Sequence, residues 1–564
     1  MRSMCRPLLL AALGSLLSST CTRALDPPGL SDFPPGAPSC KYTPPNLVRL
    51  PSPLPNSLQQ AAAKVQNVSQ SMLQAPYAPG VQVMAQYKDQ TVLEHTAGSA
   101  NVSSGLPVDS DTLFRIGSVS KLFPTILALQ AAASGKIHLD DPLEAVAPDF
   151  IMYNPWGPSK VTWRLIMQQR SGLPRECPGG NTTASVLKNL EMYALTYPPG
   201  EAPSYSNLGF ALMGHLLAER VLGLDFSAAV DKFIISPLGL NNTGFTYTPD
   251  ILNRLATGYT ATVPRQPAAF VDLGWTAPAG SAYSNAREMN ALLQAIMSAA
   301  RGEADPLGLT PAIARAFLDL DYLNFGAHTA WGAPWEVQVQ PDAFPVRSKT
   351  GSLTTYLSIV SIVPELSLSY VGFWNGAQDT MGQSRAAMAD LLPALNTTLW
   401  ALQPSPLFPQ GPQSVNGLYL QQSPGPGGET VSVGVCIFDF AGLGVPSSPL
   451  AVTFFMVGDR RQLNEVGWLA YTGQWQGNHR YVQRYVGPGG PSCFGIQGGL
   501  VAGSSLVFGE EDGQQMVAIQ GVFAGAQAIV PRVGDSSLCH KQALEDLEQH
   551  LKAPVPRPDS LRLL

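Results

Sequence analysis

The most informative chemical pattern in the chain is a serine followed three residues later by a lysine, Ser118 and Lys121. On a helix these two side chains lie on one face, within reach of each other. A serine hydroxyl needs a base to take its proton, and a lysine is such a base only when neutral, a state that burial and a neighbouring cation both favour. A serine at the start of a helix also faces backbone N–H groups that stabilise an oxyanion. The pattern therefore predicts Ser118 as a nucleophile and Lys121 as its base.

The same spacing occurs a second time, at Ser185 and Lys188, so the spacing alone does not identify a catalytic serine. The second copy follows an Asn-x-Thr sequence and precedes no comparable apolar helix. We therefore expect it to lie on an exposed helix. The ordinary alternative for Ser118 is a helix N-cap beside a solvated Lys121.

A second motif, Tyr205-Ser206-Asn207, follows a Pro-Pro-Gly turn. A tyrosine close to two ammonium groups can relay a proton, and an asparagine side chain can hold a substrate amide. Taken alone, the motif is equally typical of a loop tyrosine that packs on the core.

A third motif, Lys349-Thr350-Gly351-Ser352, leads into a strand-like run. A strand edge offers backbone N–H groups to a substrate, and a glycine lets the substrate approach closely. The Lys349 ammonium would lower the pKa of Lys121 and could bind a substrate carboxylate. A simple turn is the alternative for this motif.

The three motifs occur in order, and together they resemble the serine β-lactamase and penicillin-binding protein superfamily. The pattern is most similar to the class C β-lactamase and D-Ala-D-Ala carboxypeptidase branch with its animal β-lactamase-like members, over roughly residues 60 to 400. Supporting stretches are Gly135–Pro142, Ser171–Pro174, Pro278–Gly280, Tyr283-Ser284 and Trp331-Gly332. The chain departs from the family at Gln169-Arg170, where His-Thr usually precedes Ser-Gly-Leu.

The resemblance implies a role for each motif residue. Ser118 would form an acyl-enzyme, with Lys121 and Tyr205 sharing proton transfer. The backbone N–H groups of Ser118 and Ser352 would form the oxyanion hole. The residues that would bind and orient the substrate are Asn207, Lys349, Thr350 and Gly351.

Other function classes lack their sequence signals. The seven histidines show no spacing typical of metal ligands, and there is no Gly-x-Ser-x-Gly elbow and no phosphate-cradling glycine loop. The net charge of −6 argues against a nucleic-acid partner. We expect no cofactor or metal and a small-molecule or peptide substrate, and the sequence leaves the oligomeric state open.

Strand patterns open and close the region that carries the motifs. The expected strands are 81–87 and 91–97 at its start and 356–363 and 367–373 at its end. Apolar residues at helical spacing predict helices over 59–73, 122–133, 208–222, 287–300 and 384–399. This order predicts an α+β, β-lactamase/transpeptidase-like antiparallel sheet flanked by helices, with an inserted helical subdomain.

Short strand patterns separated by Gly and Pro follow a second Pro-rich segment and predict a small C-terminal all-β barrel or sandwich. The expected organisation is a signal peptide over 1–24, a Pro-rich linker over 25–59, a catalytic domain over 60–402, a second linker over 403–427, an all-β domain over 428–540 and a tail over 541–564.

The first residues are typical of a secretory signal. Arg2 and Arg6 precede the apolar run Leu8–Leu17, and a cut after Ala24 fits the small residues there. The run is shorter than the about 20 apolar residues that span a bilayer, although an uncleaved single-pass anchor is the alternative. Asn-x-Ser/Thr sequences at Asn67, Asn101, Asn181, Asn241 and Asn396 are further support for a glycoprotein of the secretory lumen or the exterior.

The sequence therefore predicts a secreted serine hydrolase, of the amide, ester or peptidase type, that acts through an acyl-serine intermediate. The alternative is a catalytically inactive β-lactamase-like binding or scaffold protein.

Overall fold

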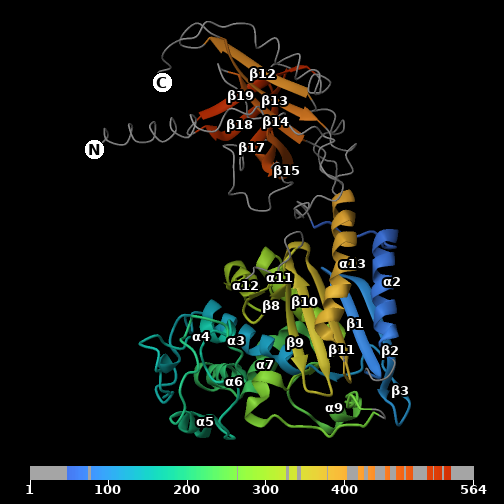
Figure 1. Cartoon of the computed structure of the whole chain (residues 1–564), viewed down its shortest axis with the longest axis vertical. Coiled ribbons are helices and arrows are strands. Elements are labelled where there is room, and N and C mark those ends of the chain that lie inside the picture. The colour runs from blue at the N-terminus through green and yellow to red at the C-terminus, as the bar shows by residue number, and fades with distance from the viewer. Residues whose placement is uncertain are drawn as a thin grey trace. The chain divides into compact units, whose positions relative to one another are not determined.

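The computed structural model describes residues 47–402, apart from 74–77, 263–264, 325–328, 339–343 and 378, together with eight strands nearer the C-terminus. The chain divides into two compact units, one formed by residues 47–402 and the other containing the C-terminal strands (Figure 1). The expected signal peptide, residues 25–46 and the expected tail lie outside the described residues.

The first unit is built on a nine-stranded antiparallel sheet with the strand order β3-β2-β1-β11-β10-β9-β8-β7-β6. Its strands are β1 (Gly80–Tyr87), β2 (Gln90–Asn101), β3 (Leu106–Pro107), β6 (Tyr322–Leu323), β7 (Thr329–Trp331), β8 (Glu336–Gln338), β9 (Val346–Ser352), β10 (Leu357–Val363) and β11 (Leu368–Trp374). The first strand, β1, pairs with the last, β11, from Val81 opposite Trp374 to Tyr87 opposite Leu368. The sheet is thus assembled from both ends of the unit, as expected.

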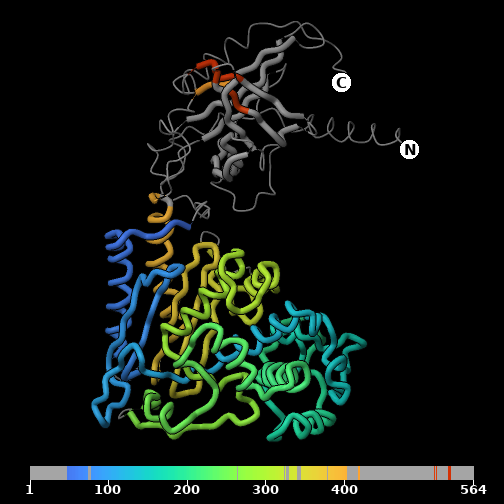
Figure 2. Tube along the Cα trace, turned by 180° about the vertical axis from the view of Figure 1, so that it is seen from behind, coloured from blue at the N-terminus to red at the C-terminus, as the bar shows by residue number. Residues whose placement is uncertain are grey.

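One face of the sheet is covered by α2 (Asn56–Ser71) and α13 (Thr380–Ala401), which lie side by side in Figure 1 and in the reverse view of Figure 2. The side chains of β1 alternate between the two faces of the sheet, because neighbouring residues of a strand point to opposite sides. Val83 and Tyr87 are buried in the cluster under these helices, whereas Met84 is buried in the cluster on the other side. Each large apolar side chain buried in this way stabilises the fold by about 1.5–3 kcal/mol.

The other face packs against a helical subdomain inserted between β4 and β9. Strand β4 is Phe114–Arg115. The helical segments of the subdomain include η2 (Gly117–Lys121), α3 (Leu122–Ala133), α4 (Trp163–Met167), α5 (Thr183–Leu190), α6 (Asn207–Leu216), α7 (Phe226–Val230), α10 (Ala277–Gly280), α11 (Ala286–Arg301) and α12 (Pro311–Leu318). Residues 122–129 of α3 are all buried, as expected for a helix that is apolar on every side. This buried helix supports the segment that carries Ser118 and Lys121.

Most expected elements of this unit are present, with small shifts at their ends. The helix expected over 122–133 has those bounds in the structure. The helix expected over 208–222 is divided into α6 and the π-helical segment η4 (Leu217–Leu222). Helix α2 begins at Asn56, inside the segment that composition assigned to the first linker, and Pro55 is its N-cap residue. The expected α+β arrangement of a sheet with an inserted helical subdomain is confirmed.

The described strands of the second unit form a closed antiparallel barrel in chain order. They are β12 (Gly417–Pro424), β13 (Thr430–Phe438), β14 (Ala451–Val457), β15 (Glu465–Trp475), β16 (Asn478–Val486), β17 (Ser505–Glu511), β18 (Gln514–Phe523) and β19 (Ala526–Gly534). Strand β12 lies within the expected second linker, so that prediction was wrong for residues 417–424. The Pro- and Gly-rich composition masked a strand that pairs with both β13 and β19 and so closes the barrel.

Candidate active site

Ser118 lies in η2, at the entrance to α3. Its neighbours in η2 are buried, whereas its own side chain is partly exposed. Gly117 has a φ of 51°, and a Cβ added there would lie 2.7 Å from the backbone nitrogen of Ser352. Only a glycine fits this backbone conformation and this close approach. The turn therefore presents Ser118 directly beside the end of β9.

The Lys121 amine is fully buried and has three partners. Its Nζ lies 3.1 Å from Ser118 Oγ, 2.7 Å from Asn207 Oδ1 and 2.8 Å from the Ala279 carbonyl oxygen. The amide and carbonyl oxygens can only accept hydrogen bonds, whereas the serine hydroxyl can also donate. An ammonium would satisfy all three partners by donating three times, whereas a neutral amine would donate to the two carbonyl oxygens and accept from the Ser118 hydroxyl, so the contacts suit both forms.

Burial, followed by the Lys349 cation, lowers the pKa of Lys121 well below its usual range. The Glu336 carboxylate acts in the opposite direction. Burial and the Lys349 cation therefore favour the unprotonated amine, which lies within reach of the Ser118 proton.

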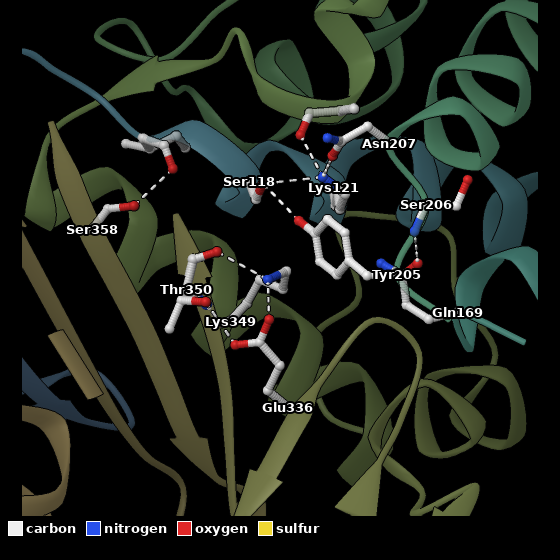
Figure 3. Close-up of polar contacts among 12 residues, drawn as sticks. Ser118, Lys121, Gln169, Tyr205, Ser206, Asn207, Glu336, Lys349, Thr350 and Ser358 are labelled. Carbon is white, nitrogen blue, oxygen red and sulfur yellow. Dashed lines mark hydrogen bonds and ion pairs between the residues drawn. The ribbon is translucent and has the colours of Figure 1, made fainter. Parts of the chain in front are cut away.

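The Tyr205 hydroxyl donates to Ser118 Oγ at 2.7 Å (Figure 3). The Tyr205 ring also lies close to two lysine nitrogens, because its centroid is 4.8 Å from Lys121 Nζ and 5.4 Å from Lys349 Nζ. The serine oxygen thus has a phenol on one side and an amine on the other. Such an arrangement can remove a proton from the serine and return one to a leaving group.

Asn207 connects Lys121 to the exposed carboxylate of Glu176. Its Oδ1 accepts from Lys121, and its Nδ2 donates to the two Glu176 carboxylate oxygens at 2.9 and 3.0 Å. Both ends of the amide are used, so the Lys121 amine on one side and the Glu176 carboxylate on the other fix the orientation of the asparagine. Sequence analysis did not single out Glu176.

Gln169 holds the segment that carries Tyr205. Its Oε1 accepts from the Ser206 N–H at 2.8 Å, and its backbone carbonyl accepts from the Ser204 N–H at 2.6 Å. Gln169 is buried and has a φ of 59°, which is rare for a residue other than glycine. This residue, known from the sequence only as a departure from the family pattern, therefore positions the tyrosine.

Arg170 is the second residue at which the chain departs from the family pattern, and it forms no ion pair with an acidic side chain among the described residues. Its guanidinium donates to the Gly200 carbonyl and lies 5.2 Å from the centroid of the Tyr322 ring. The backbone carbonyl of Arg170 in turn accepts from the Gly200 N–H at 2.8 Å. Arg170 thus ties the Pro-Pro-Gly turn before Tyr205 to the body of the subdomain.

The Lys349 ammonium is buried and lies 2.5 Å from a carboxylate oxygen of Glu336, on the neighbouring strand β8. Thr350 contacts the other oxygen of the same carboxylate, through its hydroxyl at 2.7 Å and its N–H at 3.2 Å. Burial alone would lower the pKa of Lys349, but Glu336 raises it above its usual value. Burial would likewise raise the pKa of Glu336, but Lys349 and Thr350 lower it. Both groups are therefore charged, and no local sequence pattern pointed to Glu336.

Gly351 brings β9 against the backbone in front of Ser118. A Cβ added to Gly351 would lie 2.0 Å from the Ile116 carbonyl oxygen, which also accepts from Ser358 Oγ at 2.7 Å. Ser352, the next residue, is exposed and ends β9. The two segments expected to supply oxyanion-hole N–H groups, at Ser118 and Ser352, are therefore adjacent.

Replacement of Gly351 by Ala is expected to separate these two segments, since the added methyl group meets backbone that cannot rotate away. We expect a loss of about 1–3 kcal/mol in the free energy of unfolding, measured in urea, and roughly tenfold slower reaction of Ser118 with an acylating probe. Gly209→Ala is the control, because its added methyl group meets only side-chain atoms, of which Ile166 Cγ2 is the nearest at 3.3 Å. Wild-type behaviour of Gly351→Ala would show that the close approach is not required.

The second serine-lysine pair lies on α5, an amphipathic helix that buries Thr183, Val186, Leu187 and Leu190. The expected exposure is confirmed for Lys188, whereas Ser185 is only partly exposed. Ser185 belongs to a capping box with Thr182 at the start of the helix. Lys188 is exposed and pairs with Glu191 at 2.6 Å. Neither side chain has the partners that surround Ser118 and Lys121.

Within the described ranges, no group of three or more His, Cys, Asp or Glu side chains gathers so that it could hold a metal ion.

Comparisons with known proteins agree with this geometry. The family model Beta-lactamase matches residues 65–394, which end before the barrel. A human beta-lactamase-like 1 protein is 33% identical over 380 residues, covering 64% of this chain and 74% of the relative. Beta-lactamase-like protein 2 of Dictyostelium discoideum is 28% identical over 351 residues, and the chain spans only 62% of its length.

A solved structure of a class C beta lactamase from Rhodobacter sphaeroides superposes with a TM-score of 0.50 at 24% identity, covering 59% of this chain and 99% of that chain. This likeness confirms the expected β-lactamase/transpeptidase-like fold of the first unit.

Proposed function

The chain belongs to the beta-lactamase family, and we propose that it is a serine hydrolase of amides, esters or small peptides that acts through an acyl-serine intermediate. The observation that carries the proposal is the position of Ser118 Oγ, 3.1 Å from the Lys121 amine and 2.7 Å from the Tyr205 hydroxyl. A binding or scaffold protein has no need of a buried amine with a lowered pKa beside a serine.

In the proposed reaction, Lys121 takes the Ser118 proton as Oγ attacks the substrate carbonyl carbon. The carbonyl oxygen becomes an oxyanion, which the N–H groups of Ser118 and Ser352 stabilise. Collapse of this intermediate breaks the bond to the leaving group, which receives a proton from Tyr205 while Lys121 returns the serine proton to the phenol. Water then attacks the acyl-enzyme and loses a proton to the neutral Lys121 amine. Collapse of this second intermediate breaks the bond to Ser118, whose oxygen takes the proton back from Lys121 as the acid is released.

Secretion is part of the proposal and rests on the sequence of the first residues. Three of the five possible glycosylation sites, Asn67, Asn181 and Asn241, are exposed, which supports a passage through the secretory pathway. Among the described helices, none has the length and apolarity needed to cross a membrane.

A fluorophosphonate probe tests the proposed nucleophile, because it labels only an activated serine. We expect the wild-type protein to be labelled covalently and Ser118→Ala to lose the label while keeping its circular dichroism and melting temperature. Ser185→Ala, which alters the second serine-lysine pair, should be labelled like wild type. An unlabelled, well-folded wild-type protein, or a Ser118→Ala variant that still reacts, would instead favour the scaffold alternative or another nucleophile.

A further inference from the structure

A carboxylate at the edge of the active site uses the amide of Asn207, which was expected to bind the substrate. Asn207 Nδ2 donates to both oxygens of Glu176, at 2.9 and 3.0 Å, and Asn207 Oδ1 accepts from Lys121 at 2.7 Å. Figure 3 shows the hydrogen bond between Lys121 and this amide. Glu176 is therefore separated from the Lys121 amine by only two hydrogen bonds and one amide group.

The Glu176 carboxylate can accept from a further donor. Its side chain is 62% exposed, and a second contact is the guanidinium of Arg175, whose Nε lies 3.2 Å from Oε1. A carboxylate has about four positions at which it accepts hydrogen bonds, and Asn207 and Arg175 use three of them. Arg175 is itself 67% exposed, and ion pairs this open to solvent are weak, so an incoming cation can compete for the carboxylate.

The group that suits this position is a cation. A carboxylate offers only acceptor atoms together with a full negative charge, so a substrate carbonyl or carboxylate finds no donor on it. A hydrogen bond between an ammonium group and a carboxylate is about twice as strong as one between neutral groups. Because both ends of the neutral Asn207 amide are already used, the charge of Glu176 dominates recognition on this side.

The contacts of Ser118 indicate which part of the substrate carries this cation. Tyr205 gives a proton to the leaving group in the proposed reaction, so the leaving group faces the phenol. Lys121 lies on the other side of Ser118 Oγ, and Asn207 links this amine to Glu176. A group held by Glu176 therefore belongs to the acyl part, which stays attached to Ser118 in the intermediate.

Such a cation would also favour the reactive form of the base. Burial and Lys349 lower the pKa of Lys121, whereas the Glu176 carboxylate acts in the opposite direction. A substrate ammonium group at Glu176 offsets that effect, because its positive charge lies close to the same amine. Binding of a cationic acyl group thereby favours neutral Lys121, the form that accepts a proton.

We propose that Glu176 is a specificity-determining residue that selects substrates with an ammonium group in the acyl part, within a few bonds of the scissile carbonyl. This inference rests on the proposed hydrolase function. The preferred substrates are then amides or esters of amino acids and short peptides that have a free amine. The same acyl groups without the amine are poorer ligands.

Pairs of ligands that differ in a single group test the proposal. Glycyl, β-alanyl and glycylglycyl p-nitroanilide place the ammonium group at increasing distances from the carbonyl. Propionyl, butyryl and propionylglycyl p-nitroanilide are their counterparts, in which a methyl group replaces the ammonium group and keeps the shape. Dissociation constants are measured by calorimetry on the full-length Ser118→Ala protein, so that no turnover is needed, at about pH 6.5, where the amines are protonated.

We expect at least one ammonium compound to bind at least about fivefold more tightly than its methyl counterpart, and this preference to weaken in high salt. A smaller preference in all three pairs, or one that salt leaves unchanged, overturns the proposal. This outcome is decided on Ser118→Ala alone and does not require any Glu176 variant to fold.

Adding Glu176→Gln to this protein removes the charge and keeps an oxygen that can accept from Asn207. The preference for the ammonium compound should then fall by at least about fivefold. Equal weakening of both compounds would leave the preference unchanged, as expected if Glu176 only orients Asn207, and overturns the proposal. Circular dichroism shows whether the variant is folded.

Glu191→Gln is the matched control, because Glu191 is also exposed in the helical subdomain and pairs with Lys188, at 2.6 Å. It removes the same charge from the protein without touching Asn207. Its preference should equal that of Ser118→Ala alone, and a loss like that of Glu176→Gln would assign the effect to overall charge and overturn the proposal. Failure of fluorophosphonate labelling refutes the hydrolase function separately, because these binding measurements do not depend on it.

Discussion

Replacement of Lys121 by Ala is expected to lower kcat for ester or amide hydrolysis by about three orders of magnitude or more, since it removes the group that takes the serine proton. Lys121→Arg should fail to a similar degree, because a guanidinium remains protonated and cannot be a base. The comparison separates the loss of a base from the loss of a positive charge. The measurement is steady-state hydrolysis of a chromogenic ester together with the rate of fluorophosphonate labelling.

The control for this experiment is Lys188→Ala, in which the exposed lysine of the second serine-lysine pair is removed. Its activity should be that of wild type. Circular dichroism and urea unfolding show whether the Lys121 variants are folded, since Asn207 Oδ1 and the Ala279 carbonyl lose their donor. A folded Lys121→Ala protein with unchanged turnover would contradict the assignment of Lys121 as base.

Replacement of Lys349 by Met is expected to shift the pH dependence of kcat/KM. Lys349 lowers the pKa of Lys121, so its removal raises that pKa. Hydrolysis needs neutral Lys121, and activity is lost as the pH falls through the pKa of this group. The acid limb of kcat/KM should therefore move to higher pH, with lower activity near neutrality and partial recovery in alkaline buffer. An unmoved acid limb would show that Lys349 does not act on Lys121.

The same variant should also be less stable. Without Lys349 the Glu336 carboxylate is left buried with no cation, which typically costs about 3–5 kcal/mol. Urea unfolding measures this loss. The double variant Lys349→Met with Glu336→Gln should recover most of the stability, because it buries no charge at either position. A Lys349→Met protein as stable as wild type would mean that the pair contributes little.

Local sequence determined the elements whose periodicity is strong. The bounds of α3 and the order of strands at both ends of the first unit follow from apolar spacing alone, which reflects which side of each element is buried. Strand β12 was missed because it lies in a Pro- and Gly-rich stretch. Its pairing with β19, whose residues lie about a hundred positions later, closes the barrel, and no local pattern contains that information.

The spacing of Ser118 and Lys121 also follows from the sequence, because residues three apart on a helix share a face whatever surrounds them. Ser185 and Lys188 have the same spacing, yet Lys188 is exposed and pairs with Glu191. The tertiary structure makes the difference. It buries Lys121 and surrounds it with Asn207 and Ala279, residues that are distant in the chain.

The partner of Lys349 was likewise decided only by the fold. The third motif predicted a lysine whose charge would act on Lys121, and the register of β8 against β9 placed the Glu336 carboxylate beside that lysine. Residue types and local spacing therefore determined which groups could take part in chemistry. Burial and long-range pairing determined which of them are charged and which remain free to meet a substrate, because the cost of a charge depends on its surroundings in the folded protein.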